Sequence, residues 1–285
     1  MPKNEITNKF LVVQGRTLPQ IEDSIQYFPD YWQSEFPLIS QIGFNGIEWI
    51  YDKKSETSNP ILTREGQNEM NFLSKKYNVD LENIVFDWFL VHPIIHDDEF
   101  TIKQKIDKLL SLIKSSHDSK FKRIIFPLLE KNSISNDEQF SDFIRILKND
   151  VLQVLEENQI EFNLETSLPP EKELLLLKKV DSDLVNICFD MGNSASYGYD
   201  PIEVIQKLHN NFGSVHIKDR KFQGSTCPLG MGDVRFEQIF PQLLTVRYKN
   251  PFTFQIYRNK NSNNIEILKN SLVFIKNIIV NNNVD

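Results

Sequence analysis

Eight short strand-like segments alternate with eight longer helix-like segments along nearly the whole chain, and this alternation limits the possible fold more than any other feature. The strand candidates are apolar runs at residues 9–14, 46–50, 83–91, 122–129, 161–166, 184–190, 214–219 and 252–257. The helix candidates carry apolar residues at spacings of three and four, at residues 32–42, 64–77, 100–117, 137–158, 170–180, 201–209, 236–244 and 264–280. Strands that alternate with helices pair in parallel through right-handed crossovers. Eight such units in about 250 residues predict an α/β fold, the closed (βα)8 TIM barrel.

A doubly wound open sheet is the structural alternative to a barrel. No strand candidate is followed by the GxGxxG loop of dinucleotide-binding sheets, and eight units favour closure. The sequence contains no internal linker or low-complexity segment. We therefore expect a single-domain TIM barrel over residues 1–280 and a frayed C-terminal tail over residues 281–285.

Composition and charge exclude several classes of protein. The chain of 285 residues carries a formal net charge of −7, which argues against nucleic-acid and membrane partners because phosphate binding rests on Lys and Arg. The N-terminus lacks the pattern of a signal peptide and no apolar run reaches about 18 residues, so a cytoplasmic protein is expected. Cys188 and Cys227 are too few for a disulfide scaffold or a zinc cluster. We expect Cys188 to be a small buried side chain.

Four late strand candidates each end on or near a potential metal ligand: Glu165, Asp190, His216 and Gln255. In a TIM barrel the active site lies at the C-terminal ends of the strands, so these four side chains are expected around one side of the barrel mouth. Two carboxylates, an imidazole and an amide oxygen suit one divalent ion, Mn²⁺, Mg²⁺, Co²⁺ or Zn²⁺.

The alternative for any one of these residues is a structural role. A carboxylate at the end of a strand is commonly a helix cap or an ion-pair partner. Four such residues on consecutive strands favour a metal site, because buried carboxylates need a compensating cation. The nearby Lys218 and Arg220 are the other possible source of that positive charge.

Basic residues follow the strand candidates that adjoin in a closed barrel. Arg16 follows the first, Lys218 and Arg220 the seventh, and Arg258 the eighth. Phosphate sites in TIM barrels often lie beside strands seven and eight. Each arginine alone is more commonly a surface ion pair, but their common edge favours an anionic substrate.

The sequence resembles the xylose-isomerase-like TIM barrels, a group that includes sugar isomerases, ketose epimerases, inosose dehydratase and endonuclease IV. The resemblance runs over nearly the full length and rests on these motifs: QGRTLP (14–19), IQYFPDYWQSEF (25–36), IGFNGIEWIYD (42–52), FDMGNSASYGYDP (189–201), VHIKDR (215–220) and PLGMGDVRF (228–236). It implies a metal ion held by a Glu, an Asp, a His and a second Glu, and the first three correspond to Glu165, Asp190 and His216.

The resemblance also places further residues at the site. Glu48 and Asn193 fall where the family has polar groups that support substrate or ligands, and the loop of Gly230, Met231 and Gly232 could add backbone amides to an anion site. A homodimer is allowed by the resemblance alone.

Gln255 departs from the family pattern, which has a glutamate at this position. In the ketose epimerases two glutamates work from opposite faces of the substrate, and an amide cannot act as the second base. An amide oxygen can still coordinate a metal ion, which favours proton transfer by one base. Glu165 is the candidate base, with Lys218 or His92 as a second acid or base. His92 could equally be an ordinary loop residue, or contact the substrate.

The resemblance and the ligand set predict a metal-dependent sugar or sugar-phosphate isomerase or epimerase. One alternative is a dehydratase of a keto-polyol, which also begins by removing a proton beside a carbonyl. Another is a non-catalytic sugar-binding barrel that has lost the second carboxylate. A phosphodiesterase acting on abasic DNA would need additional His and acidic ligands for three zinc ions, and the chain has five histidines in all.

Overall fold

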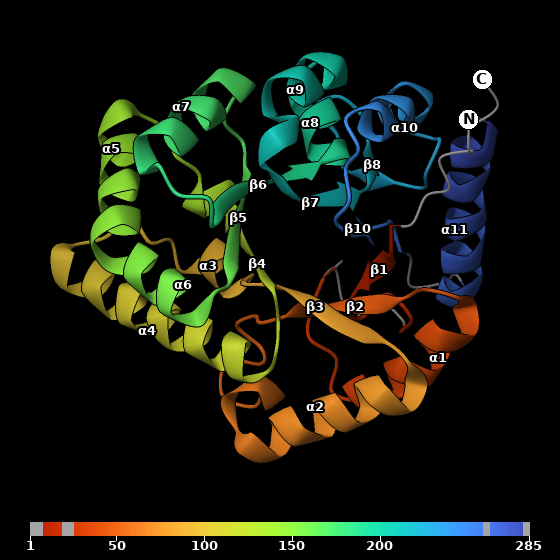
Figure 1. Cartoon of the computed structure of the whole chain (residues 1–285), viewed down its shortest axis with the longest axis horizontal. Coiled ribbons are helices and arrows are strands. Elements are labelled where there is room, and N and C mark those ends of the chain that lie inside the picture. Colours follow the sequence, from red (N-terminus) through yellow and green to blue (C-terminus); the bar gives the residue numbers. More distant parts are fainter. Residues whose placement is uncertain (1–7, 19–25, 259–262, 282–285) are drawn as a thin grey trace.

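The computed structural model describes residues 8–18, 26–258 and 263–281, and within them eight parallel strands close into a barrel (Figure 1). Around the barrel the strands follow the order β1, β10, β7, β6, β5, β4, β3, β2. Their bounds are β1 Phe10–Val13, β2 Gly46–Ile50, β3 Asp80–Val85, β4 Arg123–Leu128, β5 Glu161–Thr166, β6 Val185–Asp190, β7 Phe212–Ile217 and β10 Phe252–Phe254. The prediction of a single-domain TIM barrel is confirmed.

Helices form a layer around the barrel (Figure 1). The longer ones are α1 Glu35–Ile42, α2 Arg64–Tyr77, α4 Glu99–Asp118, α5 Asp137–Ile146, α6 Leu152–Asn158, α7 Pro170–Val180, α9 Pro201–Leu208, α10 Phe236–Thr245 and α11 Asn264–Asn281. The short helices α3 Trp88–Val91 and α8 Met191–Tyr197 follow β3 and β6, and a small antiparallel pair, β8 Asp219–Arg220 and β9 Thr226–Cys227, follows β7. A π-helical turn joins α5 to α6, so residues 137–158 are helical throughout, as predicted.

Local sequence signals explain where several helices begin. The side chain of Thr63 accepts a hydrogen bond from the backbone amide of Gly66 at the start of α2. Asp200 caps α9 in the same way, and Pro201 occupies the first turn, where its missing N–H has no cost. These two helices begin at the predicted residues.

The third strand was predicted too late in the sequence. The apolar run at residues 83–91 predicts one strand, but the structure has β3 at Asp80–Val85 and the helix α3 at Trp88–Val91. The amide of Phe86 still donates to the carbonyl of Ile125 in β4, whereas the amide of Phe89 donates to the carbonyl of Phe86 and closes a helical turn. A short apolar run does not distinguish a buried strand from a buried helical turn.

The eighth barrel strand is shorter than predicted and ends at Phe254 rather than at residue 257. The amide of Gln255 nevertheless donates to the carbonyl of Ile217 in β7, which holds Gln255 at the barrel mouth. Helix α8 was not predicted, because its polar sequence lacks an apolar stripe.

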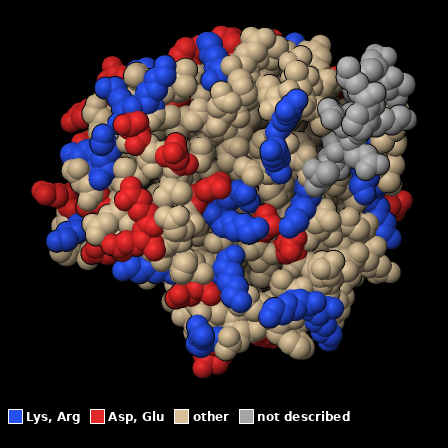
Figure 2. Space-filling model, viewed as in Figure 1, with Lys and Arg blue, Asp and Glu red and all other residues tan. Residues whose placement is uncertain are grey.

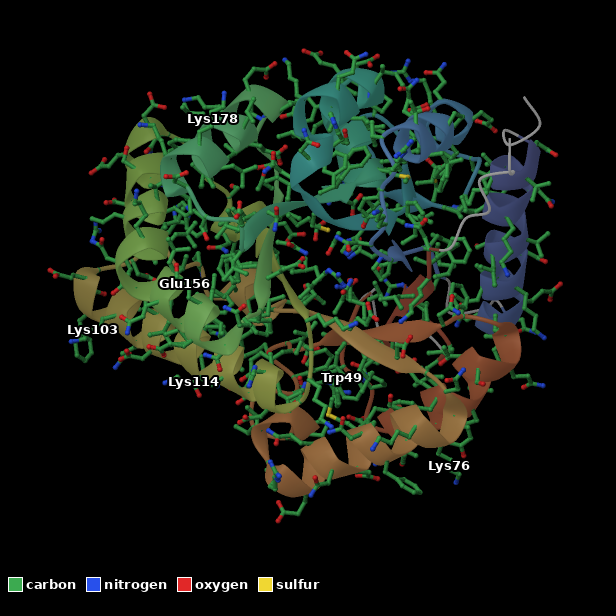
Figure 3. The ribbon with its side chains drawn as sticks, in the orientation of Figure 1. Trp49, Lys76, Lys103, Lys114, Glu156 and Lys178 are labelled. Carbon is green, nitrogen blue, oxygen red and sulfur yellow. The ribbon has the colours of Figure 1, made fainter. Side chains whose placement is uncertain are left out.

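Side chains alternate between the barrel interior and the helix layer. On β2, Glu48 faces inward and Trp49 faces outward, where its ring lies 5.3 Å from the ring of Trp32 and 5.6 Å from that of Phe28. Figure 3 shows Trp49 within the ribbon, whereas Lys103 on α4 extends away from the molecule. Apolar contacts therefore bind the helices to the barrel wall and leave its interior free for polar groups.

The charged surface drawn in Figure 2 mixes Lys and Arg with Asp and Glu, without a continuous basic face in this view. None of the helices in the described ranges combines the length and the apolar character of a membrane span. Of the expected tail at residues 281–285, Asn281 still belongs to α11, and residues 282–285 lie outside the described part of the chain.

Candidate functional site

The four residues predicted as metal ligands come together at the C-terminal ends of neighbouring strands. Glu165 is near the end of β5, Asp190 ends β6, His216 lies beside Asp190 in the register of β6 and β7, and Gln255 directly follows β10. All four are buried. The four side chains that were chosen because they end strands therefore lie together in the structure.

His216 is held from inside the barrel by Glu48. The ring nitrogen Nε2 lies 2.9 Å from Glu48 Oε1, and both side chains are fully buried. The other carboxylate oxygen of Glu48 accepts hydrogen bonds of 3.1 Å from Asn83 and from Thr253. Glu48 was predicted to support the substrate or a ligand, and its contact in the structure is with the imidazole.

The second nitrogen of His216, Nδ1, faces the two carboxylates. It lies 3.9 Å from Glu165 Oε2 and 3.9 Å from Asp190 Oδ2, and it has no hydrogen-bond partner among the described residues. A buried, unpaired ring nitrogen costs free energy unless something binds it. Two carboxylates around such a nitrogen form the donor set that a divalent ion takes.

Burial raises the pKa of Glu165; the His216 side chain opposes the shift and the Asp190 carboxylate adds to it. Its Oε1 atom accepts a hydrogen bond of 2.7 Å from the Asn193 amide group, which leaves Oε2 directed toward His216. Asn193 is fixed in turn by Arg220, whose guanidinium donates to its side-chain oxygen over 2.7 Å. One carboxylate oxygen of Glu165 is thus held by Asn193, and the other faces His216, where it could bind a metal ion.

Lys218 and Gln255 form the other side of the cluster. The Lys218 Nζ atom donates to the Gln255 amide oxygen over 2.8 Å and lies 3.5 Å from Asp190 Oδ2. The Gln255 amide nitrogen donates to Gln26 Oε1 over 3.0 Å. An ammonium group therefore already supplies part of the positive charge that the carboxylates need.

A cavity of about 1020 Å³ opens above these residues. Its lining includes six of the predicted site residues, namely Arg16, Glu165, Asn193, Lys218, Arg220 and Gln255. Asp190 and His216 do not line it, but each lies within 4 Å of a residue that does: His216 is 3.9 Å from Glu165, and Asp190 is 3.5 Å from Lys218. This volume is at the upper end of the range found for small-molecule binding sites.

Three predicted substrate contacts do not line this cavity. Glu48 lies beneath His216 in the barrel interior. His92 follows α3 and stacks on the Trp88 ring at a centroid distance of 4.0 Å. Arg258 donates to the carbonyl of Gly15 and lies 4.5 Å over the ring of Tyr27. The contacts of these three residues in the structure are internal.

The expected anion-binding amides are also engaged within the protein. The backbone amides of Gly230 and Gly232 donate to Asp219 Oδ2 over 2.8 and 3.0 Å. Arg16 donates to the carbonyl of Ile256 over 3.0 Å, although it still lines the cavity. Positive charge at the cavity therefore comes from side chains and not from this loop.

Sequence reasoning missed Cys188 as a residue of the site. Its burial is confirmed, but its sulfur lies close to Glu165 and His216: one donor atom from each of the three residues is within 4.8 Å of those of the other two. Cys188 is two residues before Asp190 on β6, so the alternation of inward-facing positions would have placed it in the barrel interior.

Sequence reasoning also missed two residues on the opposite rim. Gln26 donates to Asp87 Oδ2 over 2.5 Å and thereby connects Gln255 to the end of β3. Asp87 lies inside the predicted strand 83–91, and Gln26 lies between the first strand candidate and the first helix candidate, so no predicted strand end pointed to either residue.

Comparisons with known proteins agree with the barrel fold. The family model of the xylose isomerase-like TIM barrel matches residues 36–278. The protein MJ1311 of Methanocaldococcus jannaschii is 25% identical over 149 residues. The match covers 50% of this chain and 50% of MJ1311.

Two solved structures share the fold over nearly their whole length. The structure of L-ribulose 3-epimerase superposes with a TM-score of 0.75 at 16% sequence identity. The match covers 97% of this chain and 96% of the epimerase chain. The structure of the IOLI protein with a binding zinc atom has a TM-score of 0.75 at 13% identity, over 96% of this chain and 98% of its own. Because the family model matches residues 36–278, which is most of this chain, the chain belongs to the xylose isomerase-like TIM barrel family.

Proposed function

We propose that this protein is a metal-dependent isomerase or epimerase of an anionic sugar, with a sugar phosphate or a uronate as the substrate class. The observation that carries the proposal is the unpaired His216 Nδ1, buried between the carboxylates of Glu165 and Asp190 at the barrel mouth. Solved structures of the same fold include an L-ribulose 3-epimerase and a protein with bound zinc, which supports both parts of the proposal.

Glu165, Asp190 and His216 are the residues that would hold the ion, with the Gln255 amide oxygen as a fourth donor once Lys218 releases it. A divalent ion at this position, Mn²⁺, Mg²⁺, Co²⁺ or Zn²⁺, polarises a substrate carbonyl and makes the adjacent C–H group more acidic. The pairing of His216 Nε2 with Glu48 keeps Nδ1 directed toward the carboxylates.

Glu165 is the proposed base. Its carboxylate lines the substrate cavity, and a carboxylate within reach of a substrate C–H group is a common general base. Asn193 orients this carboxylate, which would take a proton from the carbon beside the carbonyl and return it to the neighbouring carbon. Lys218 lines the cavity and carries protons, which suits it to donate to a substrate oxygen.

Gln255 decides which proton transfers are open to the enzyme. An amide neither accepts nor returns a proton at the pH of the cell, so the face of the substrate opposite Glu165 has no second carboxylate from this position. Transfer between two carbons on one face, as in the interconversion of an aldose and a ketose, is the reaction that this site supports best.

The proposal that the substrate is anionic rests on the basic side chains at the cavity. Five basic residues line it beside four acidic ones: Arg16, Lys53, Lys54, Lys218 and Arg220, with Asp52, Asp87, Glu130 and Glu165. A phosphate or carboxylate group at one end of the substrate would meet the basic side chains while the other end reaches Glu165.

The experiment is a screen of sugar phosphates and uronates for deuterium uptake from heavy water in the presence of Mn²⁺. Exchange reports proton removal without requiring the product to be known. An isomeric sugar as product supports the proposal, and loss of water would instead identify a keto-polyol dehydratase. No uptake with any substrate, in protein that binds sugar, would support a non-catalytic barrel.

The variant Glu165→Gln is expected to lower exchange by at least about 100-fold. The matched control is Glu173→Gln, which changes another buried glutamate whose partner is Thr166 and which does not line the large cavity. This control is expected to exchange at the wild-type rate.

A further inference from the structure

Cys188 occupies the inward-facing position of β6 one step before Asp190. In the register of β6 and β7, Cys188 lies beside Ser214 and Asp190 lies beside His216. Only 3% of Cys188 is exposed, and the opening of the barrel lies on the side of Asp190. Its sulfur therefore approaches the candidate metal centre from the barrel interior, opposite the substrate cavity.

The donor atoms of Glu165, Cys188 and His216 form a compact group, all within 4.8 Å of one another. Among residues 8–18, 26–258 and 263–281 this is the one such group of three or more His, Cys, Asp and Glu side chains. Two ligands of a tetrahedral zinc ion lie roughly 3.5 Å apart, so small side-chain rotations would bring these three atoms to one ion.

Two of the other candidate ligands already have partners. The Gln255 oxygen accepts a hydrogen bond from Lys218, and its nitrogen donates to Gln26. Asp190 accepts a hydrogen bond of 2.7 Å from the backbone amide of Asn193 through Oδ1, and its Oδ2 faces Lys218. Where a relative would have a second glutamate, this chain has an amide in contact with an ammonium group.

His216 provides an independent sign that the group binds something. It is fully buried, its Nε2 lies 2.9 Å from Glu48 Oε1, and neither ring nitrogen has a well-formed hydrogen bond among the described residues. Burial without a partner is costly for such a nitrogen, and a bound cation would remove the cost.

We propose that the Cys188 sulfur is a ligand of the divalent ion, together with Glu165 and His216. This inference rests on the proposed metal-dependent function. On binding, the S–H bond breaks, its proton passes to solvent, and the sulfur lone pair forms the bond to the ion, with no oxidation or reduction. A thiolate ligand shifts the preference of the site from Mg²⁺ and Mn²⁺ toward Zn²⁺ and Co²⁺.

The test is a titration of the metal-free full-length protein with Co²⁺, followed by absorption spectroscopy. Thiolate bound to Co²⁺ gives an intense charge-transfer absorption in the near ultraviolet, which oxygen and nitrogen ligands do not give. The variant Cys188→Ser removes the sulfur at nearly constant volume, and Cys227→Ser in β9 is the matched control.

The absorption is expected in the wild-type protein and in Cys227→Ser, and it is expected to be absent in Cys188→Ser. Loss of a supporting residue behind a metal ligand costs about 10–100-fold in affinity, so loss of this ligand is expected to weaken Co²⁺ binding at least about tenfold. Cys188→Ala should behave in the same way, and melting curves of the metal-free variants establish that they are folded.

The outcomes separate this inference from the proposed function. Co²⁺ binding without the charge-transfer absorption, and with equal affinity in Cys188→Ser, would overturn the role of Cys188 and leave the metal site standing. Failure of the wild-type protein to bind Co²⁺ or Zn²⁺ at all would overturn both.

Discussion

The ammonium nitrogen of Lys218 lies 2.8 Å from the amide oxygen of Gln255, the position at which the family resemblance predicts a second glutamate. A glutamate there would neutralise Lys218 as an ion pair. With the amide, that charge faces the Asp190 carboxylate at 3.5 Å, the Glu165 carboxylate and the substrate cavity. An amide in place of a carboxylate would therefore leave more positive charge for a substrate in the cavity.

Restoring the carboxylate should strengthen metal binding. In Gln255→Glu a further negative ligand faces the site, and ligand charge is a main determinant of divalent-ion affinity. We expect the dissociation constant for Mn²⁺, measured by calorimetry on metal-free protein, to fall by about tenfold or more. Gln255→Leu, which removes the oxygen without adding charge, is the control and should not gain affinity. Equal affinity of Gln255→Glu and the wild-type protein would show that this position is not at the metal site.

Lys218 should matter for catalysis and not for metal binding. Lys218→Met removes a proton donor that lines the cavity, and a general acid contributes about 10²–10⁴-fold to a rate. The deuterium-exchange rate at saturating substrate is expected to fall by that range. The affinity for Mn²⁺ should stay equal or increase, because a cation beside Asp190 is lost. A loss of metal affinity in this variant would assign Lys218 a structural role instead.

Glu48 is predicted to be a positioning residue for His216. In Glu48→Gln the contact at 2.9 Å to Nε2 loses its charge, and removal of such a partner behind a metal ligand costs about 10–100-fold in affinity. Calorimetry with Zn²⁺ measures the loss. Thr253→Val removes one of the hydrogen bonds to Glu48 and should have a smaller effect. If Glu48→Gln bound Zn²⁺ as tightly as the wild-type protein, the orientation of His216 would have another cause.

Glu173 makes the stability of the protein depend on pH. Burial raises the pKa of this carboxyl from 4.5 to about 7, against the effect of the hydrogen bond from Thr166. Below the unfolded pKa of 4.5 the group is protonated in both states. Between the two pKa values the folded state holds the proton more tightly, so the free energy of unfolding falls as the pH rises, by about 3 kcal/mol in full.

Glu173→Gln removes this titration and keeps an acceptor for Thr166. Denaturation at about pH 5 and about pH 8 should show the variant gaining about 2 to 3 kcal/mol relative to the wild-type protein at the higher pH. A constant difference between the two proteins at both pH values would mean that the Glu173 carboxyl titrates normally.

The sequence predicted those parts of the site that depend on where a strand ends. Glu165, Asp190 and His216 follow from the rule that catalytic groups lie at the C-terminal ends of barrel strands. The contact of Glu48 with His216 joins β2 to β7 across the barrel interior, and no spacing along the chain predicts it. The partners of Gln255 depend on side-chain rotamers in the same way.

The misplaced elements have a related cause. Residues 83–91 are apolar because they are buried, first in a strand and then in a helical turn, and burial alone does not give the backbone conformation. Cys188 was expected to be buried, which is confirmed, but its neighbours depend on the register between β6 and β7.

The central claim is that Glu165, Asp190 and His216 hold one divalent ion on which proton transfer depends. Its most direct test is calorimetric titration of the metal-free protein with Mn²⁺, for the wild type and for Asp190→Asn, with melting curves to establish that both are folded. The account predicts one ion per wild-type chain and binding weakened at least about tenfold in the variant. Absence of binding to the wild-type protein, or equal affinity of the two proteins, would contradict it.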